Sequence, residues 1–319
     1  MTHTVAIIGL GVMGQRMLGS MALSEQFSAV SAWDPDAGAR DHTRRLYPQI
    51  RIADSAADAI SGQDTEIVYI ACPPVWHKEY AVAAMQAGKA VYCEKPLGID
   101  VAQSRDLVEQ ARDAGVVNIV NFSLASAAAV TEVEKLLQAG ALGELAGVDV
   151  RVHFSQWPRE WQMDAADWLS YREQGGFTRE VLSHWVYLTE RLFGRAELRH
   201  AAARYPGDKL SETHVIAELQ AGPLPVSIAG SVGGKGPDLV EYTVWGSLQS
   251  CRIVDWNRLF TSSGGEWQAQ LTHIDDPRQL GYQLQLENAA AAIAGADHSM
   301  PDFADALSVQ TLIENMLAA

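Results

Sequence analysis

Residues 4–14 read Thr-Val-Ala-Ile-Ile-Gly-Leu-Gly-Val-Met-Gly. The apolar start of this stretch is typical of a strand buried on both faces of a parallel sheet. Gly9 allows a tight turn, Gly11 lets backbone N–H groups approach a pyrophosphate, and Gly14 lets the following helix pack close to the strand. The stretch therefore predicts a strand, a turn and a helix that together bind a dinucleotide.

A carboxylate follows the second expected strand, at residues 29–33. Asp34 lies 20 residues after Gly14, where an acidic side chain accepts hydrogen bonds from the ribose hydroxyls of NAD. Because a carboxylate should repel the 2′-phosphate of NADP, the sequence favours NAD. NADP stays open because basic side chains follow closely, at Arg40, Arg44 and Arg45. An ordinary helix cap is the alternative role for the aspartate.

Strands and helices continue to alternate as far as residue 121. We expect helices over residues 54–61, 76–87 and 101–114, strands over residues 66–71 and 116–121, and a further strand leading to Lys95. Helices between successive strands make a parallel, doubly wound sheet the simplest solution. Residues 1–121 are therefore predicted to form a dinucleotide-binding domain.

Lys95 is expected at the carboxyl end of a strand. It follows Val91 and Tyr92, which suit a buried strand, and it precedes Pro96, which cannot continue the sheet. Open α/β sheets bind their ligands at this edge. A solvated loop lysine is the alternative interpretation.

Two prolines end the strand that precedes the one leading to Lys95. Pro73 and Pro74 stop it where its end should face the nicotinamide side of a cofactor. His77 comes directly afterwards. It contacts substrate or cofactor in one interpretation and is an ordinary first-turn histidine in the other.

The composition excludes several classes of protein. The chain has 319 residues, which suits two domains, and 48% hydrophobic with 20% charged residues is typical of a globular protein. A net charge of −15 gives no basic surface for nucleic acid or an anionic membrane. Three cysteines without a CxxC pair indicate neither disulfides nor a metal site, which fits the cytoplasm. The apolar N-terminal run lacks the basic residues that begin a signal peptide.

The pattern changes in residues 122–319, which we expect to form a substrate-binding and oligomerisation domain. Expected strands cover residues 146–154, 198–204, 214–219, 226–231, 239–246 and 251–256. Expected helices cover residues 130–138, 176–193, 279–294 and 302–317. Turn residues separate most of these strands, which predicts a large, open, mainly antiparallel sheet covered by helices on one face. Its other face is expected to join copies of the chain into a homodimer or homotetramer.

A second candidate group lies in the helix that follows Gly175 and Gly176. Glu180 and His184 are four residues apart and share one helix face, with Tyr187 three residues further on. A histidine with a carboxylate that orients it fits a general base and its partner. A buried structural histidine is the alternative.

The approach to this helix is rich in aromatic and basic side chains. The aromatic residues are Trp157, Trp161, Trp168, Tyr171 and Trp185, and the arginines are Arg159, Arg172 and Arg179. Aromatic faces suit sugar rings, and arginine suits a carboxylate on the substrate. Many of these aromatic residues could equally fill the core or an interface between copies. We expect at least one of the arginines to face the substrate.

Over nearly its whole length the chain resembles the glucose–fructose oxidoreductase / inositol dehydrogenase / rhizopine-catabolism (Gfo/Idh/MocA) oxidoreductase family. Five stretches carry the resemblance: Gly9-Leu10-Gly11-Val12-Met13-Gly14, Ala71-Cys72-Pro73-Pro74 with His77, Ala87-Gly88-Lys89-Ala90-Val91-Tyr92-Cys93-Glu94-Lys95-Pro96, Gly140-Ala141-Leu142-Gly143-Glu144-Leu145, and Gly175-Gly176 through His184. The resemblance implies an N-terminal Rossmann domain, a C-terminal sheet domain, a nicotinamide cofactor, catalysis by Lys95 and His184, and sugar-like or cyclitol substrates.

The residues and the resemblance together give three sets of candidate site residues. The cofactor-binding set is Gly9, Gly11, Val12, Met13, Gly14, Asp34, Cys72, Pro73, His77, Glu94 and Lys95. The catalytic set is Lys95, His184 and Glu180. The substrate-binding set is Lys95, Trp157, Trp168, Arg172, Arg179, Glu180 and His184.

The chain also departs from the family's pattern around the substrate. Glu180 stands where the family usually has Asp, Leu182 where it usually has Gly, and Tyr187 where it usually has a second Asp. Leu169 follows Trp168 in place of a frequent arginine, and Leu124-Ala125 replaces an Arg-aromatic pair. The substrate therefore cannot be copied from a relative.

The sequence thus predicts an NAD(P)-dependent oxidoreductase that transfers hydride between a nicotinamide and a secondary alcohol or carbonyl of a small, sugar-like substrate. Two alternatives stay open. One is a non-catalytic nicotinamide-binding sensor or regulatory subunit, because fold does not fix function. The other is an epimerase or lyase that recycles its bound NAD.

Overall fold

The structure is a computed structural model that describes residues 2–319, in two compact units. Unit 1 comprises the chain up to Phe122 together with Tyr282–Leu307, and unit 2 comprises Ser123–Gly281 together with Ser308–Ala319. The boundaries fall inside α9 (Pro277–Ile293) and α10 (Phe303–Ala318).

The sheet of unit 1 is parallel throughout. Its order is β3 (Arg51–Ile52), β2 (Phe27–Trp33), β1 (His3–Ile8), β4 (Ile67–Ile70), β5 (Ala90–Cys93) and β6 (Asn118–Val120). The strand order reverses at β1, which lies between β2 and β4, and such a switch point is where doubly wound sheets bind ligands. The predicted Rossmann sheet is confirmed.

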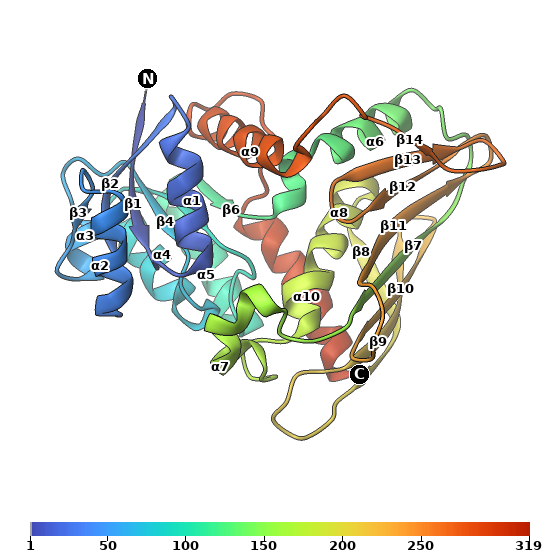
Figure 1. Cartoon of the computed structure of the whole chain (residues 1–319), viewed down its shortest axis with the longest axis horizontal. Helices are drawn as coiled ribbons and strands as arrows, with labels where there is room; N and C mark the ends of the chain where they lie inside the picture. Colours follow the sequence, from blue (N-terminus) through green and yellow to red (C-terminus); the bar gives the residue numbers. More distant parts are fainter. Residues whose placement is uncertain (1) are drawn as a thin grey trace. The chain divides into compact units, whose positions relative to one another are not determined.

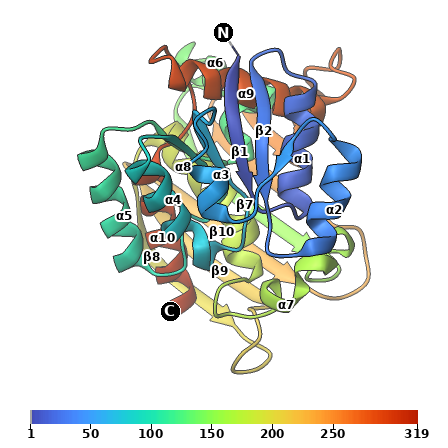
Figure 2. The ribbon, with the colours of Figure 1, turned by 90° about the vertical axis from the view of Figure 1, so that its left-hand side faces the viewer.

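Helices cover both faces of this sheet. They are α1 (Val12–Ala22), α2 (Ala37–Leu46), α3 (Ala56–Ile60), the short 3₁₀ helix η1 (Pro74–Trp76), α4 (His77–Gln86) and α5 (Val101–Ala114). Helices α1 and α2 lie on one side of β1 and β2, and α4 and α5 on the other (Figure 2). Side-chain caps begin several helices: Asp36 accepts from the Ala39 amide and Asp100 from the Gln103 amide.

A late segment of the chain, Tyr282–Leu307, groups with unit 1, whereas the sequence placed it with the second domain. β6 is an edge strand, and its Val120 amide donates to the carbonyl of Pro301. The Phe303 amide donates to the Asn118 side chain. The segment therefore supplies partners to an edge whose backbone groups would otherwise be exposed.

Unit 2 contains the large sheet that the sequence predicts. Its order is β14 (Gln268–Ala269), β13 (Arg258–Ser262), β12 (Ser250–Val254), β11 (Leu239–Gly246), β7 (Leu145–Phe154), β10 (Leu224–Val232), β9 (His214–Ala221) and β8 (Ala196–Arg204). Among the described strands of this sheet, only β10 and β7 pair in parallel, so the mainly antiparallel prediction is confirmed. The sequence analysis missed β13 and β14.

The helices of unit 2 are mostly short. They are η2 (Ser123–Ser126), α6 (Ala128–Gln138), η3 (Glu160–Ala165), α7 (Ala166–Leu169), the π-helical segment η4 (Thr178–Leu182) and α8 (Ser183–Phe193). The expected single helix over residues 176–193 is therefore a π-helical turn followed by an α-helix. Helix α8 lies against one face of the sheet (Figure 1), where Trp185 stacks on Tyr242 at 5.6 Å. Within residues 2–319 no helix is long and apolar enough to cross a membrane.

Candidate active site

The glycine turn after β1 is shaped both by packing and by open space. Gly9 has a φ of 98°, and a Cβ there would lie 2.6 Å from the Ala71 carbonyl. A Cβ at Gly14 would lie 2.0 Å from the carbonyl oxygen of Gly9. A Cβ at Gly11, in contrast, would meet nothing within 4 Å. The packing of the turn thus requires Gly9 and Gly14, and the open approach to Gly11 fits the pyrophosphate of a dinucleotide.

Asp34 ties this turn to the end of β2. Its Oδ2 accepts from the Leu10 amide at 2.7 Å and its Oδ1 from the Asp36 amide at 2.8 Å. Each carboxylate oxygen can accept a second hydrogen bond, so the group keeps the capacity to bind ribose hydroxyls. Arg40 donates to the carbonyls of Asp34 and Pro35, at 2.5 and 2.9 Å, and thereby shapes the loop.

A buried polar network holds Glu94, the residue before Lys95. The Oε1 atom of Glu94 accepts from the Tyr69 hydroxyl at 2.5 Å and from Nδ2 of Asn121 at 2.6 Å. The Oδ1 atom of Asn121 in turn accepts from the Tyr92 hydroxyl at 2.7 Å and from Nε2 of Gln285 at 2.5 Å. Burial raises the pKa of Tyr69 and of Tyr92 well above the usual range, so both phenols stay donors. The network fixes the end of β5, from which the half-buried Lys95 emerges.

The sequence analysis included Glu94 but missed Asn121 and Gln285. Two tyrosines in otherwise apolar strands, Tyr69 and Tyr92, were the available signal, because a buried hydroxyl needs a partner.

His77 contacts backbone on both sides of its ring. It is fully buried, with Nδ1 2.8 Å from the carbonyl oxygen of Pro96 and Nε2 2.9 Å from that of Cys72. These contacts occupy both ring nitrogens and argue against a direct contact with substrate or cofactor. Burial raises the pKa of the Cys72 thiol to about 12, so this cysteine also stays protonated. His77 instead links the turns that follow β4 and β5.

In unit 2, His184 lies between a hydroxyl and an indole. Its Nδ1 is 3.5 Å from the Ser123 hydroxyl, and its ring lies 5.3 Å from that of Trp256 at an interplanar angle of 88°. The imidazole is 7% exposed, so these neighbours restrict its orientation. Trp256 has a φ of 72°, which is rare for a bulky side chain. Neither Ser123 nor Trp256 was a candidate from the sequence. The backbone conformation of Trp256 leaves no signal in the sequence.

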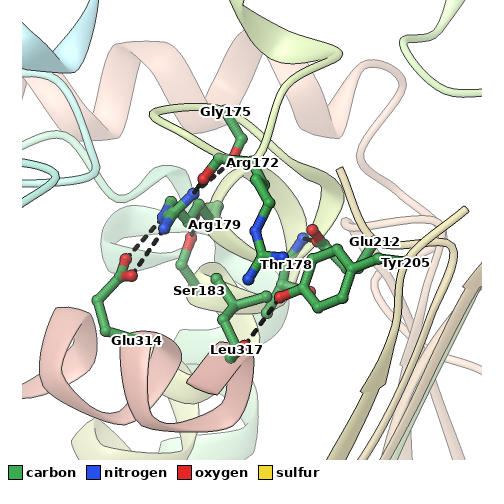
Figure 3. A network of polar contacts seen from close by, with 9 residues as sticks. All are labelled: Arg172, Gly175, Thr178, Arg179, Ser183, Tyr205, Glu212, Glu314 and Leu317. Carbon is green, nitrogen blue, oxygen red and sulfur yellow. Dashed lines mark hydrogen bonds and ion pairs between the residues drawn. The ribbon is translucent and has the colours of Figure 1, made fainter. Parts of the chain in front are cut away.

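Glu180 is half-buried in the π-helical segment and directly follows Arg179 in the chain. Protein groups surround the side chain of Arg179 (Figure 3). Arg179 donates from Nε and Nη2 to the carboxylate of Glu314, at 2.6 and 2.7 Å. Its Nη1 donates to the carbonyls of Arg172 and Gly175, at 2.7 and 2.8 Å. These contacts hold the guanidinium of Arg179 within the protein, and its role in substrate binding stays a prediction.

A second carboxylate holds the start of the same segment. Glu212 is 1% exposed, and its Oε1 accepts from the Thr178 amide at 2.5 Å. Gly176 has a φ of 111°, and a Cβ there would lie 2.8 Å from Oε2 of Glu212. The glycine pair in the sequence is therefore explained partly by this close approach. Neither Glu212 nor Glu314 was a candidate in the sequence analysis.

Some of the aromatic side chains that precede the π-helical segment pack against the core of unit 2. Trp157 donates from Nε1 to the Leu169 carbonyl at 3.1 Å and packs against Phe154 and Phe177. Trp168 is half-buried. Arg172 is exposed, with its guanidinium 3.9 Å from the centre of the Tyr205 ring. Among the predicted substrate contacts of unit 2, Trp157, Trp168, Arg172 and Glu180 keep accessible surface, whereas Arg179 and His184 are buried.

Residues 3–122 match a family model described as the oxidoreductase family with an NAD-binding Rossmann fold (Gfo/Idh/MocA). Among curated proteins, a levoglucosan dehydrogenase from Pseudarthrobacter phenanthrenivorans is 29% identical over 185 residues, which are 56% of this chain and 44% of that protein. The chain spans about half the length of the curated relatives it matches.

Two solved structures share the fold over almost the whole chain. The WlbA dehydrogenase from Bordetella pertussis, in complex with NADH and UDP-GlcNAcA, gives a TM-score of 0.84 at 21% identity, over 99% of this chain and 95% of that one. A 3-ketoreductase from Actinomadura kijaniata, in complex with NADP and TDP-benzene, gives 0.82 at 17% identity, over 100% and 98%. The resemblance read from the sequence is therefore confirmed for residues 3–122, which match the Gfo/Idh/MocA oxidoreductase family model.

Proposed function

We propose that the chain is an NAD(P)-dependent oxidoreductase that acts on a secondary alcohol or carbonyl of a sugar, a cyclitol or a related small molecule. The observation that carries this proposal is the buried network around Glu94. It fixes a half-buried lysine at the carboxyl end of β5 in a sheet of the NAD-binding Rossmann type. The sugar dehydrogenase among the curated relatives supports the substrate class.

The residues of unit 1 fit a nicotinamide dinucleotide. In the proposal the turn from Gly9 to Gly14, with Val12 and Met13, holds the pyrophosphate, and Asp34 binds the adenosine ribose. Cys72, Pro73 and Glu94 lie in the turns after β4 and β5, and the proposal assigns them to the cofactor site as well. When bound, the cofactor supplies the acceptor or donor of the hydride.

Each catalytic side chain has a role in the proposal. Lys95 binds the reacting oxygen of the substrate and stabilises the negative charge that develops there. His184 accepts the hydroxyl proton, and Ser123 and Trp256 restrict its imidazole. Glu180 orients His184 or holds a second hydroxyl of the substrate. In a second version of the proposal, Lys95 is the group that transfers the proton.

The substrate contacts proposed for unit 2 are Trp157, Trp168, Arg172, Glu180 and His184. Arg172 stacks on Tyr205 and can still pair with a carboxylate of the substrate. Arg179, in contrast, already pairs with Glu314. An acidic sugar therefore fits the proposal as well as a neutral one.

We also propose that copies of the chain associate through the outer face of the unit 2 sheet, as a dimer or tetramer. Ile216 is 63% exposed and Trp245 is 41% exposed on this sheet. The cytoplasm is the proposed location, on the support of the free thiols of Cys72, Cys93 and Cys251.

The proposed function is tested with the variant Lys95→Ala. Purified protein is incubated with NAD and a panel of sugars, sugar acids and cyclitols, and formation of reduced cofactor is followed. Lys95→Ala should lower turnover by about 100-fold or more, because charge stabilisation and proton transfer each contribute on that order. NAD binding, measured by calorimetry, should be largely retained.

Lys78→Ala is the matched control, since Lys78 pairs with the exposed Asp106. It should leave turnover unchanged. Near-normal turnover in Lys95→Ala would contradict both versions of the mechanism. NAD binding without turnover across the panel would instead favour a sensor.

Preference for NAD over NADP is the finer part of the proposal. A 2′-phosphate about 4 Å from the Asp34 carboxylate would cost on the order of 4 kcal/mol at an effective dielectric constant of 20. Asp34→Asn removes the charge and keeps an acceptor for the Leu10 amide, so it should narrow the affinity gap between NAD and NADP. Equal affinities in the unaltered protein would mean that Arg40 governs this site and that Asp34 does not.

A further inference from the structure

Three aromatic side chains meet at the carboxyl edge of the unit 1 sheet. Trp33 is the last residue of β2, Trp76 is the last residue of η1, and Tyr80 lies in α4. The rings of Trp76 and Tyr80 stack, with centroids 6.5 Å apart at 26°. The rings of Trp33 and Tyr80 meet edge to face, at 6.3 Å and 71°. Because β2 and β4 flank β1, the cluster joins the two sides of the glycine turn.

The outermost of these rings stays accessible. Trp76 is 47% exposed, whereas Tyr69 and Tyr92 in the same unit are fully buried. A single exposed tryptophan is not unusual by itself. Here, however, its indole is held by stacking on a half-buried tyrosine, so one flat ring is oriented in advance without being covered.

The cluster lies beside the carboxylate that the proposed function assigns to the adenosine ribose. Trp33 directly precedes Asp34 in the chain. Burial raises the pKa of the Tyr80 phenol, and the negative charges of Glu79 and Asp34 add to the shift, so the tyrosine and the aspartate are electrostatic neighbours. Asp34 itself binds the Leu10 amide of the glycine turn.

We propose that Trp76, supported by Tyr80, is the stacking surface for the adenine ring of the dinucleotide. The inference rests on the proposed function, since it takes Asp34 as the ribose ligand. The adenine is bonded directly to that ribose and must lie close to it. A flat, pre-oriented indole matches the face of a purine, and base stacking on aromatic side chains is a common mode of nucleotide binding.

The test measures binding alone and needs no substrate. ADP-ribose carries the adenine without nicotinamide, and nicotinamide mononucleotide carries nicotinamide without adenine. Trp76→Leu should weaken the binding of ADP-ribose and NAD by about 5- to 150-fold, the range that loss of one base stack gives. It should leave the affinity for nicotinamide mononucleotide within about twofold. Trp76→Phe, which keeps an aromatic face, should recover most of the affinity for ADP-ribose.

Controls separate stacking from general damage to the fold. Leu23→Ala removes another exposed apolar side chain of unit 1, 79% exposed, and should change no affinity. Thermal unfolding of each variant reports its folding.

Two results would overturn the inference while leaving the proposed function intact. One is ADP-ribose binding by folded Trp76→Leu within twofold of the unaltered protein. The other is an equal loss for ADP-ribose and nicotinamide mononucleotide, which would indicate a structural role. Failure of the unaltered protein to bind NAD, NADP or ADP-ribose would overturn the proposed function and this inference together.

Discussion

Asn121 shows how much one amide side chain can hold together in this protein. It donates to both Glu94 and Tyr69 and accepts from Tyr92 and Gln285. Asn121→Leu should leave the buried Glu94 carboxylate with fewer donors, at a cost of about 1–3 kcal/mol in the free energy of unfolding. Urea unfolding measures this loss, and turnover should fall as well because the end of β5 loosens.

Gln110→Ala is the control, since Gln110 binds the exposed Asp106 on the surface of α5 and should contribute little. If Asn121→Leu unfolded at the same urea concentration as the unaltered protein, the network would not be what fixes Lys95.

The sequence predicted the position of Lys95 but not the side-chain network that fixes it. Pro96 and the apolar strand before it are neighbours in the chain, so their effect on Lys95 is local. The contact between Asn121 and Gln285 joins residues 164 positions apart. No local pattern carries that information, and only the fold brings these side chains together.

Among the helices and loops of unit 2, the ion pair of Arg179 and Glu314 joins the π-helical segment to α10. The side chains are 8% and 21% exposed. Arg179→Met should cost about 3 kcal/mol of unfolding free energy, near the lower end for buried pairs because Glu314 keeps some contact with water. Adding Glu314→Leu should recover part of that loss, since no unpaired carboxylate then remains.

The exposed pair of Arg44 and Asp41 provides the comparison, with side chains 56% and 58% exposed. Arg44→Met should change the unfolding free energy by less than about 1 kcal/mol. Equal costs for the two arginine variants would show that the contacts of Arg179 do not stabilise the segment.

Glu212, which lies on the loop before β9 and accepts from the Thr178 amide at the start of the π-helical segment, should make the stability of the protein depend on pH. Burial raises the pKa of its carboxyl above 4.5, although hydrogen bonds from Thr178 and the charge of Arg179 oppose the shift. The folded state therefore holds the proton more tightly than the unfolded chain does. The contribution of Glu212 to the unfolding free energy should fall as pH rises from 4.5 through the folded-state pKa.

Glu212→Gln keeps an acceptor for the Thr178 amide and cannot ionise, so its unfolding free energy should fall less over that range. Thermal or urea unfolding at several pH values checks the difference. Identical pH profiles for the two proteins would contradict the raised pKa.

The sequence predicted the helix that contains Glu180 and His184, but not its π-helical start. The spacing of Glu180 and His184 suits a helix, and the sequence correctly predicts one there. The start of that helix, however, is set by Glu212 and Arg179 through partners on the loop before β9 and on α10. A helical period in the sequence cannot report such distant constraints.

For the whole molecule, the proposed association through the unit 2 sheet gives a direct prediction. Ile216→Glu places a charge on the outer face of β9 and should dissociate the oligomer, because a buried unpaired charge is costly. Sedimentation velocity at micromolar protein measures the change. Leu23→Glu, on a more exposed residue of unit 1, should leave the oligomeric state unaltered. A monomeric unaltered protein would refute the proposal.

Unit 1 is completed by residues far along the chain, so it cannot finish folding until most of the chain has been synthesised. Phe122 leaves the ribosome long before Tyr282–Leu307, which supply Gln285 to the Glu94 network and Pro301 to the edge of β6. At about 5–20 residues per second, the wait is roughly 10–40 s. During that time the nascent sheet has an unpaired edge strand and an incomplete set of donors at Asn121, a state prone to pairing with other chains. The cofactor-binding unit starts first and is finished near the end, so a ribosome that stalls between these two segments would release a chain with an unfinished nucleotide site.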